Sequence, residues 1–231
     1  MTRRLLTVVQ LALPLLWWPM FVQAAVPLAV EDADLLPAQG CEWELGVDRV
    51  RPRDDTAQRV LDSRAGCTWW SHTQLNLAHT RSRGAEGLDL AWSAYGKTRL
   101  IERQDGAWGL TLAWELERAR PAGARAHFAY AGAAGVLSRA WDEERWWLHL
   151  NLGWGRDRLA RQTTPFWSVG VEFAPTDRID WILEAYGERH AKPSLGLGAR
   201  VYLGQEWSVG LMASHQRPGV RGLGGWLRWA F

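Results

Sequence analysis

Two adjacent pairs of side chains, Ser71 with His72 and Ser214 with His215, have the residue types of a hydrolytic or acyl-transfer site. A serine nucleophile needs a histidine base within hydrogen-bond reach and a carboxylate that orients the imidazole. Neighbouring residues of a β-strand point to opposite faces, so a strand would separate the two members of each pair. We therefore expect polar loop or rim residues at these positions, and the sequence assigns no catalytic residue.

The histidines and the glycine-rich segments give no sign of a metal or cofactor site. His72 and His79 are an odd number of residues apart, which places them on opposite faces of a strand, and no two histidines are separated by a single residue. Gly196 and Gly198 lack the strand-to-helix setting of a phosphate-binding loop. The sequence therefore predicts a protein without a metal or a cofactor.

The elements that position these residues are expected to be short β-strands. In segment 107–118, Trp108, Leu110 and Leu112 alternate with Gly109 and Thr111, which is the period of a strand with one apolar face. Segment 65–72 is expected to be a turn that carries Cys67, and the polar segment 156–164 an outer loop. The same alternation, with turn residues between the segments, predicts about 12 strands, at 41–50, 57–64, 73–81, 87–100, 107–118, 124–137, 145–155, 166–173, 178–187, 195–203, 207–213 and 223–231.

The last strand, 223–231, would leave an exposed sheet edge unless the first strand pairs with it. Such pairing closes the sheet, and because both ends then lie on one side, the number of strands must be even, with about ten as the alternative. Fifteen of the 17 tryptophans follow residue 25, and tryptophan prefers membrane interfaces. The predicted fold class is therefore all-β, a closed antiparallel transmembrane β-barrel over residues 41–231.

Residues 1–24 have the features of a cleavable signal peptide, with Arg3 and Arg4 before an apolar run and small residues before Ala25. An inner-membrane anchor is the alternative. Residues 25–40 show no period and are expected to form a short periplasmic segment. Without the signal peptide, 25 basic residues match 25 acidic ones. No stripe of basic residues with interleaved aromatic residues indicates a nucleic-acid partner.

Cys41 and Cys67 are the two cysteines of a chain that is expected to be exported. An oxidising compartment favours one disulfide over a metal site or a free nucleophile, with two reduced thiols as the alternative. If the first strand starts and the second ends on the periplasmic side, the two cysteines lie at adjacent strand ends. A disulfide between them is then geometrically plausible.

The polar faces of the strands are expected to line the inside of the barrel. One interpretation is a lumen that selects solutes by charge and aromatic contact. The other is a salt-bridged interior that plugs a small barrel. About 12 strands enclose more room than the eight whose side chains can fill the interior, which favours the solute path. The inward-facing candidates are Glu42, Glu44, Asp48, Glu115, Glu117, His149, Glu172, Asp180, Glu184, Tyr186, Arg200, Tyr202, Trp226 and Arg228.

Four parts of the chain carry a family resemblance: 40–48 (GCEWELGVD), 147–154 (WLHLNLGW), 173–178 (FAPTDR) leading into 181–188 (WILEAYGE), and 225–231 (GWLRWAF). Together they resemble the bacterial outer-membrane proteins of the MetA-pathway of phenol degradation family. Membership implies an outer-membrane barrel and a conduit for small or aromatic compounds, without a fixed catalytic motif. The terminal Phe231 also resembles the C-terminal signature of outer-membrane barrels, which their assembly machinery reads.

These observations predict a monomeric barrel in the bacterial outer membrane, in contact with outer-membrane lipid, that acts as a porin-like channel or transporter for small solutes. One alternative is a lipid-modifying enzyme with a Ser/His/carboxylate cluster at one rim. Outer-membrane lipid A deacylases and phospholipases are similar in type, but their His-x-Ser motif is absent. The other alternative is a non-conducting structural barrel with a plugged lumen.

Overall fold

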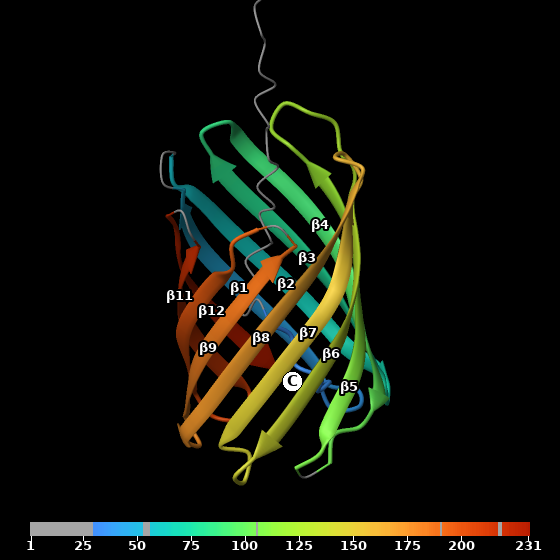
Figure 1. Ribbon diagram of the computed structural model, residues 1–231, viewed down its shortest axis with the longest axis vertical. Helices are drawn as coiled ribbons and strands as arrows, with labels where there is room; N and C mark the ends of the chain where they lie inside the picture. Colours follow the sequence, from blue (N-terminus) through green and yellow to red (C-terminus); the bar gives the residue numbers. More distant parts are fainter. Residues whose placement is uncertain (1–29, 53–55, 105, 190, 217–218) are drawn as a thin grey trace, which may run out of the picture.

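The chain forms a closed β-barrel (Figure 1). The computed structural model describes residues 30–52, 56–104, 106–189, 191–216 and 219–231, and these residues form twelve antiparallel strands. Within the same residues, no helix has the length and apolarity needed to cross a membrane. The strands are β1 (Cys41–Arg51), β2 (Gln58–Trp70), β3 (Thr73–Gly84), β4 (Gly87–Ile101), β5 (Trp108–Arg120), β6 (His127–Trp141), β7 (Trp146–Asp157), β8 (Gln162–Thr176), β9 (Ile179–Glu188), β10 (Ser194–Tyr202), β11 (Trp207–Gln216) and β12 (Val220–Ala230).

The barrel closes where β12 pairs with β1. Their register runs from Glu42 opposite Ala230 to Arg51 opposite Arg221. Beyond it, the amide nitrogen of Cys41 donates to the carbonyl oxygen of Phe231 over 2.7 Å, and that of Phe231 donates to the carbonyl oxygen of Cys41 over 2.8 Å. Every strand thus has two neighbours, and the predicted pairing of first and last strands is confirmed.

The barrel has an apolar outside and a polar inside. Leu77, Leu152 and Leu211 on the outer face keep 66%, 69% and 66% of their surface exposed, whereas Thr111 and Ser138 on the inner face are fully buried. Exposure of this outer surface to water would be unfavourable, because the free energy falls when apolar surface leaves water. The alternation predicted from the sequence therefore marks a wall with hydrocarbon outside and polar groups inside.

We call the end of the barrel where β1 begins and β12 ends the terminal end, and the other the distal end. Aromatic rings gather around the terminal end in two stacks. In the first, Trp146 lies 4.3 Å from Phe173, measured between ring centroids. In the second, Trp229 lies 5.4 Å from Trp207 and 4.2 Å from Phe231. Such rings suit a membrane interface, where one part of the ring is apolar and the other wet.

Two sequence-based boundaries were wrong. The expected turn at 65–72 belongs largely to β2, which pairs with β1 and β3 through Cys67 and continues to Trp70. Most of the expected outer loop at 156–164 is also strand, since Asp157 of β7 pairs with Gln162 of β8. In both places polar residues extend a hydrogen-bonded ladder, which the polarity pattern alone does not reveal.

The longer β2 places Cys67 directly opposite Cys41. The two form a disulfide, with their Cα atoms 4.1 Å apart and a sequence separation of 26. The bond joins the start of β1 to β2 at the terminal end, next to the barrel seam. The disulfide expected from the compartment argument is therefore present in the structure.

We predict that the double variant Cys41→Ser/Cys67→Ser folds into the same barrel with a lower free energy of unfolding. A crosslink that closes a loop of this length contributes about 3 kcal/mol by restricting the unfolded chain. Guanidinium unfolding in detergent, followed by tryptophan fluorescence, measures the loss, and wild-type protein under reducing conditions is the matched control. Equal midpoints for oxidised wild type and the variant would show that the strand ladder alone holds this seam.

Candidate functional site

The predicted inward-facing residues all lie on the inner wall of the barrel. The strand registers place them in rows around the lumen: Arg228 lies opposite Glu44, Arg200 opposite Asp180, and Glu184 opposite Gly196. Burial agrees, because Glu44, His149, Glu172, Asp180 and Glu184 are each less than a tenth exposed. The register and burial thus agree with the inward parity read from the sequence, and contact of these residues with a solute stays a prediction.

One group of these residues surrounds Arg200. Its Nε and Nη2 atoms donate to Oδ2 of Asp180 over 2.8 Å and 2.6 Å, and Nη2 also donates to Glu172. The Tyr202 hydroxyl donates to the same Asp180 oxygen over 2.8 Å. With His149, these residues line a cavity of about 360 Å³ that reaches the turn 142–145 at the terminal end. The structure thus gathers five predicted lumen residues around one mouth.

A second group joins β12, β1 and β2. Arg228 Nε donates to Glu42 Oε2 over 2.8 Å, and Arg64 Nη2 lies 3.0 Å from Glu44 Oε1. Arg64 also donates to the Tyr95 hydroxyl on β4 over 3.3 Å. Sequence analysis missed Arg64 because the apolar contrast of its strand is weak, although its even spacing from Asp62 was a usable signal. Charges inside the barrel are therefore largely paired, as buried charges must be.

The remaining candidates line other parts of the wall. Glu115 and Glu117 lie opposite Tyr95 and Ser93 in the ladder between β4 and β5. Asp48 lies across Gly224, where an added Cβ would come within 1.8 Å of its Oδ1 atom. Tyr186 lies opposite Ser168 on β8 and Ser194 on β10. These positions follow the predicted parity, but they do not converge on the cavity.

Trp226 packs against the wall and does not project into open space. It is 6% exposed and forms an apolar cluster with Ile182 and Met212. Its ring covers Gly210, where an added Cβ would lie 2.1 Å from the indole. Trp226 therefore packs against the inner wall. Its ring can lie close to the wall because Gly210 has no side chain.

Residues 30–40, which we call the inner strap, enter the barrel: residues 30–36 contact its inner wall, and residues 37–39 are exposed before β1 begins. This segment was expected as part of a periplasmic lead. The strap follows the inner wall from one strand to the next: Val30 contacts Gly170 of β8, Glu31 binds Asn151 of β7, Leu36 binds Gln74 of β3, and Gln39 donates to Thr68 of β2. The strap therefore crosses the inner face of about half the barrel within ten residues.

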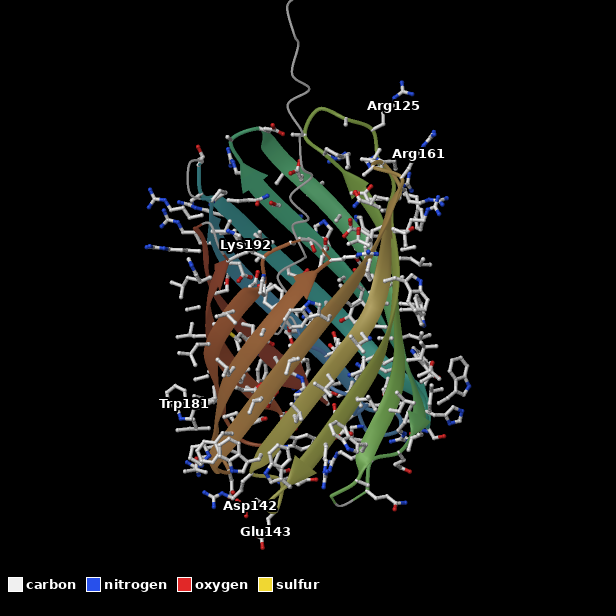
Figure 2. All side chains as sticks on the ribbon, viewed as in Figure 1. Arg125, Asp142, Glu143, Arg161, Trp181 and Lys192 are labelled. Atoms are coloured by element: carbon white, nitrogen blue, oxygen red, sulfur yellow. A yellow bond between two sulfur atoms is a disulfide. The ribbon has the colours of Figure 1, made fainter. Side chains whose placement is uncertain are left out.

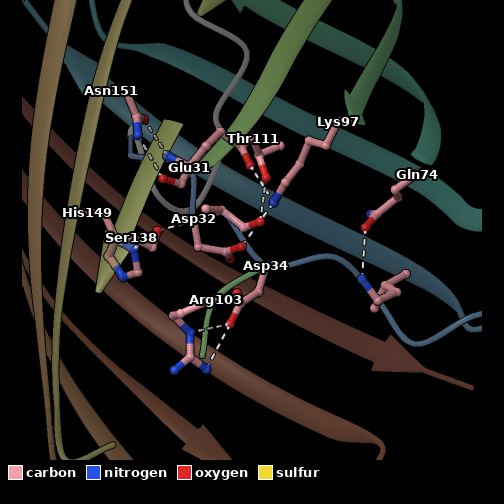
Figure 3. Close-up of polar contacts among 12 residues, drawn as sticks. Glu31, Asp32, Asp34, Gln74, Lys97, Arg103, Thr111, Ser138, His149 and Asn151 are labelled. Carbon is pink, nitrogen blue, oxygen red and sulfur yellow. Dashed lines mark hydrogen bonds and ion pairs between the residues drawn. The ribbon is translucent and has the colours of Figure 1, made fainter. Parts of the chain in front are cut away.

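Backbone hydrogen bonds hold the middle of the strap (Figure 3). Glu31 donates its amide to Asn151 Oδ1 and accepts from Asn151 Nδ2, over 2.8 Å and 2.9 Å. Ala33 donates its amide to Ser138 Oγ over 2.8 Å and accepts from Thr111 Oγ1 over 2.6 Å. The side chains of the barrel thus satisfy a backbone that has no strand partner, which explains the buried polar residues on this wall.

Charged side chains fix the strap at two further points. Lys97 Nζ lies 3.0 Å from Asp32 Oδ1 and 3.5 Å from Glu31 Oε2. Arg103 donates to Asp34 Oδ2 over 3.2 Å and to Glu144 Oε1 over 2.8 Å. Lys97 is only 6% exposed, so the acidic strap supplies the negative charge that this buried cation requires.

The electrostatics of Asp32 follow from this arrangement. Enclosure in the barrel alone would raise the pKa of the Asp32 carboxyl, but Lys97 and, less strongly, His149 hold that pKa below its usual value. A carboxylate with a lowered pKa stabilises the bound state in its ionised form. Ionised Asp32 therefore favours docking of the strap.

Three side chains form a Ser/His/carboxylate line that sequence analysis missed. Ser138 Oγ lies 2.8 Å from His149 Nδ1, and His149 Nε2 lies 3.7 Å from Glu172 Oε1. The three come from β6, β7 and β8, so only the fold brings them together. Ser138 is fully buried and already accepts the Ala33 amide. No substrate atom can approach its oxygen while the strap is docked, and the line serves to hold the strap.

The two adjacent Ser/His pairs behave differently from each other. Ser214 faces the lumen opposite Gly222, and His215 is exposed outside, as expected for a strand. Ser71 and His72 lie in the turn between β2 and β3, where Ser71 Oγ is 2.8 Å from His72 Nδ1. The expected separation of that pair was wrong, because a turn lacks strand alternation. Among the described residues no carboxylate binds the His72 ring, and no cluster of three potential metal ligands occurs.

Comparisons with known proteins give one family match and several solved structures with a similar fold. A family model described as "Uncharacterised conserved protein UCP029691" matches residues 12–228. No curated protein matches the chain. The fold is similar to that of the COG4313 outer membrane channel from Pseudomonas putida F1, with a TM-score of 0.62 at 10% identity, covering 88% of this chain and 100% of the other.

Two further solved structures have the same fold. The KdgM porin has a TM-score of 0.61 at 6% identity, with 81% of this chain and 99% of the other covered. The NanC porin has a TM-score of 0.58 at 6% identity, with coverage of 81% and 98%. The chain therefore has the fold of outer-membrane porins. The finer likeness to the MetA-pathway family has no counterpart in the family match.

We predict that Lys97→Met releases the strap. The change removes the buried cation that pairs with Asp32 and Glu31, so docking loses its main ion pair. Hydrogen–deuterium exchange of the amides of residues 31–36 is expected to accelerate by about tenfold or more. Lys192→Met, an exposed lysine at the distal end, is the control and should leave exchange unchanged. Unaltered exchange in Lys97→Met would mean that the backbone hydrogen bonds alone hold the strap in place.

A second prediction concerns pH. Because the docked pKa of Asp32 is lowered, its contribution is fully present above the free value of about 4 and is lost as the pH falls through the lowered value. Exchange of the strap amides, corrected for intrinsic rates, should therefore stay slow from pH 7 to about 4 and rise below. Asp32→Asn should remove the part of this rise that Asp32 causes. A rise already complete at pH 6 would contradict the assignment.

Proposed function

The chain belongs to the family described as "Uncharacterised conserved protein UCP029691", and we propose that this member is a porin-like channel for small solutes in the bacterial outer membrane. The similarity to the KdgM porin, the NanC porin and the COG4313 channel supports the architecture that such a function needs. The lumen of this chain supplies the support for the function itself.

The observation that carries the proposal is the polar lumen with its cavity of about 360 Å³ at the terminal mouth. A barrel built only to span the membrane gains nothing from charged groups inside, because each must be paired to offset its desolvation. Arg200 pairs with Asp180 and Glu172 at the edge of a space that reaches the end of the barrel. Such a charged rim is the feature by which channels select solutes.

The inner strap narrows this path. It is held by hydrogen bonds and ion pairs to Asn151, Ser138, Lys97 and Arg103, and Val30 and Ala33 supply its buried apolar contacts. Polar contacts of this kind exchange readily for water when a segment moves away. We propose that the docked strap is the restrictive state of the channel and that its displacement widens the path.

The charge of the mouth indicates the class of solute. Seven carboxylates line the cavity against two arginines. This balance favours cations and neutral molecules over anions of similar size. The resemblance to the MetA-pathway of phenol degradation family supports small aromatic compounds as solutes, and the rings of Trp147 and Tyr202 in the same lining offer surfaces for them. The carboxylates are Asp32, Asp34, Glu143, Glu144, Glu172, Asp177 and Asp180.

The remaining parts of the proposal concern export and surroundings. Residues 1–24, proposed as a signal peptide, lie outside the described residues. The barrel is proposed to work as a monomer whose outer face contacts membrane lipid. Phe231, stacked on Trp229 at the seam, is proposed as the residue that the barrel assembly machinery recognises. The terminal end then faces the periplasm.

Planar-bilayer recording of the purified protein tests the function. We predict measurable conductance for wild type and a larger conductance for a chain lacking residues 25–36, because this deletion removes the part of the strap that contacts the inner wall and so widens the lumen. Strap-deleted protein that still conducts nothing would favour a structural barrel. Equal conductance of the two proteins would contradict the role of the strap and leave the channel proposal standing.

Ion selectivity gives an independent prediction. Wild type should prefer cations, and the triple variant Glu143→Gln/Glu144→Gln/Asp177→Asn should lose much of this preference, because it removes three negative charges from the mouth. Reversal potentials in a salt gradient measure the change. Glu86→Gln, at an exposed turn of the distal end, is the control. Identical reversal potentials for the triple variant and wild type would show that this mouth does not select ions.

A further inference from the structure

Six arginines form a patch on the outer wall near the distal end, which we call the arginine patch: Arg49, Arg51, Arg59, Arg81, Arg83 and Arg221. They lie on β12, β1, β2 and β3, which are neighbours in the barrel. All six have the outward parity of their strands and are exposed. The patch is far from the terminal mouth and takes no part in the lumen.

The register places these arginines directly against one another. Arg51 lies opposite Arg221, and Arg59 lies between Arg49 on one side and Arg83 on the other. Residues paired in this way have Cβ atoms roughly 5 Å apart, and like charges at that distance repel. Among the described residues no carboxylate forms an ion pair with the six, whereas Arg64, Arg200 and Arg228 inside the barrel all have one. An anion from outside the chain would remove the repulsion.

The patch borders the apolar belt. Val47, Leu61 and Leu223 come two residues from Arg49, Arg59 and Arg221 on the same outward faces, and they are 56%, 39% and 62% exposed. Two residues of strand span about 7 Å. Guanidinium groups in this row therefore lie where acyl chains end and headgroups begin. A hollow of about 340 Å³ opens among Arg49, Arg51 and Arg59, with Thr56 and Ala57 completing its lining.

The two ends of the barrel differ in charge. Arg125, Arg161 and Lys192 lie at the distal end, while Asp142 and Glu143 lie at the terminal end (Figure 2). The distal end therefore attracts anions, and the patch concentrates this attraction beside hydrocarbon. Guanidinium groups bind phosphate through paired hydrogen bonds, which makes arginine well suited to lipid phosphate groups.

We propose that the arginine patch is a binding site for the phosphate groups of a multiply acylated, phosphorylated glycolipid of the outer leaflet, that is, a lipopolysaccharide. The phosphates bind among Arg49, Arg51 and Arg59, and the acyl chains lie along the apolar belt below. The inference rests on the membrane position of the barrel and not on conduction. It also assigns the distal end to the outer leaflet.

The test measures binding of lipopolysaccharide to the purified full-length protein in neutral detergent, by native mass spectrometry and by the shift of the thermal unfolding midpoint. The dissociation constant of the triple variant Arg49→Gln/Arg59→Gln/Arg83→Gln should rise by about tenfold or more. Wild-type protein should bind lipid without phosphates with a similarly reduced affinity, and this binding should depend less on the salt concentration. Arg139→Gln/Arg178→Gln, exposed arginines nearer the terminal end, should bind as wild type does.

The thermal stability of the triple variant without lipid shows whether the variant is still folded. In neutral detergent the triple variant should unfold at the same temperature as wild type or higher, because three repelling charges are gone. Unchanged affinity in the triple variant, or equal affinity for lipid without phosphates, overturns the proposal. Full competition by inorganic phosphate at equal concentration overturns the lipid source and leaves a free-anion site. Unchanged single-channel conductance of the variant is expected, so this result is independent of the channel test.

Discussion

The structure depends on one constraint: a backbone surrounded by hydrocarbon must satisfy its polar groups within the chain. An open sheet cannot do so, because its two edge strands would present unpaired amides and carbonyls to lipid. The ladder between β12 and β1, completed by the mutual bonds of Cys41 and Phe231, removes both edges. Closure in turn creates an enclosed inner face, and the proposed channel function depends on what that face holds.

The inner face shows the same rule at the level of side chains. Arg200 and Arg228 are matched by carboxylates on neighbouring strands, and Lys97 finds its partners on the strap. The strap has no ladder of its own, so Ser138, Asn151 and Thr111 bind its backbone. Polar residues on the wall that look like a solute path in the sequence are thus partly ligands of the protein's own segment.

The alternation of single strands could be predicted from the sequence, because a period of two in residues such as Trp108 to Glu117 fixes which side chains share a face. What it could not give was the neighbour across the ladder. Arg49, Arg59 and Arg83 are separated by 10 and 24 residues along the chain and meet only through register. The strap was missed for a related reason: residues 30–40 have no period, and their fixed conformation comes entirely from partners such as Asn151 and Lys97.

The strap is covalently continuous with β1, and Cys41, where β1 starts, is bonded to Cys67. One end of the strap is therefore anchored to the wall, also in the displaced state that we propose. Return to the wall is then an intramolecular reaction, driven by an effective concentration on the order of millimolar for so short a tether. If the strap blocks the channel as proposed, its return needs no partner protein and does not depend on the protein concentration.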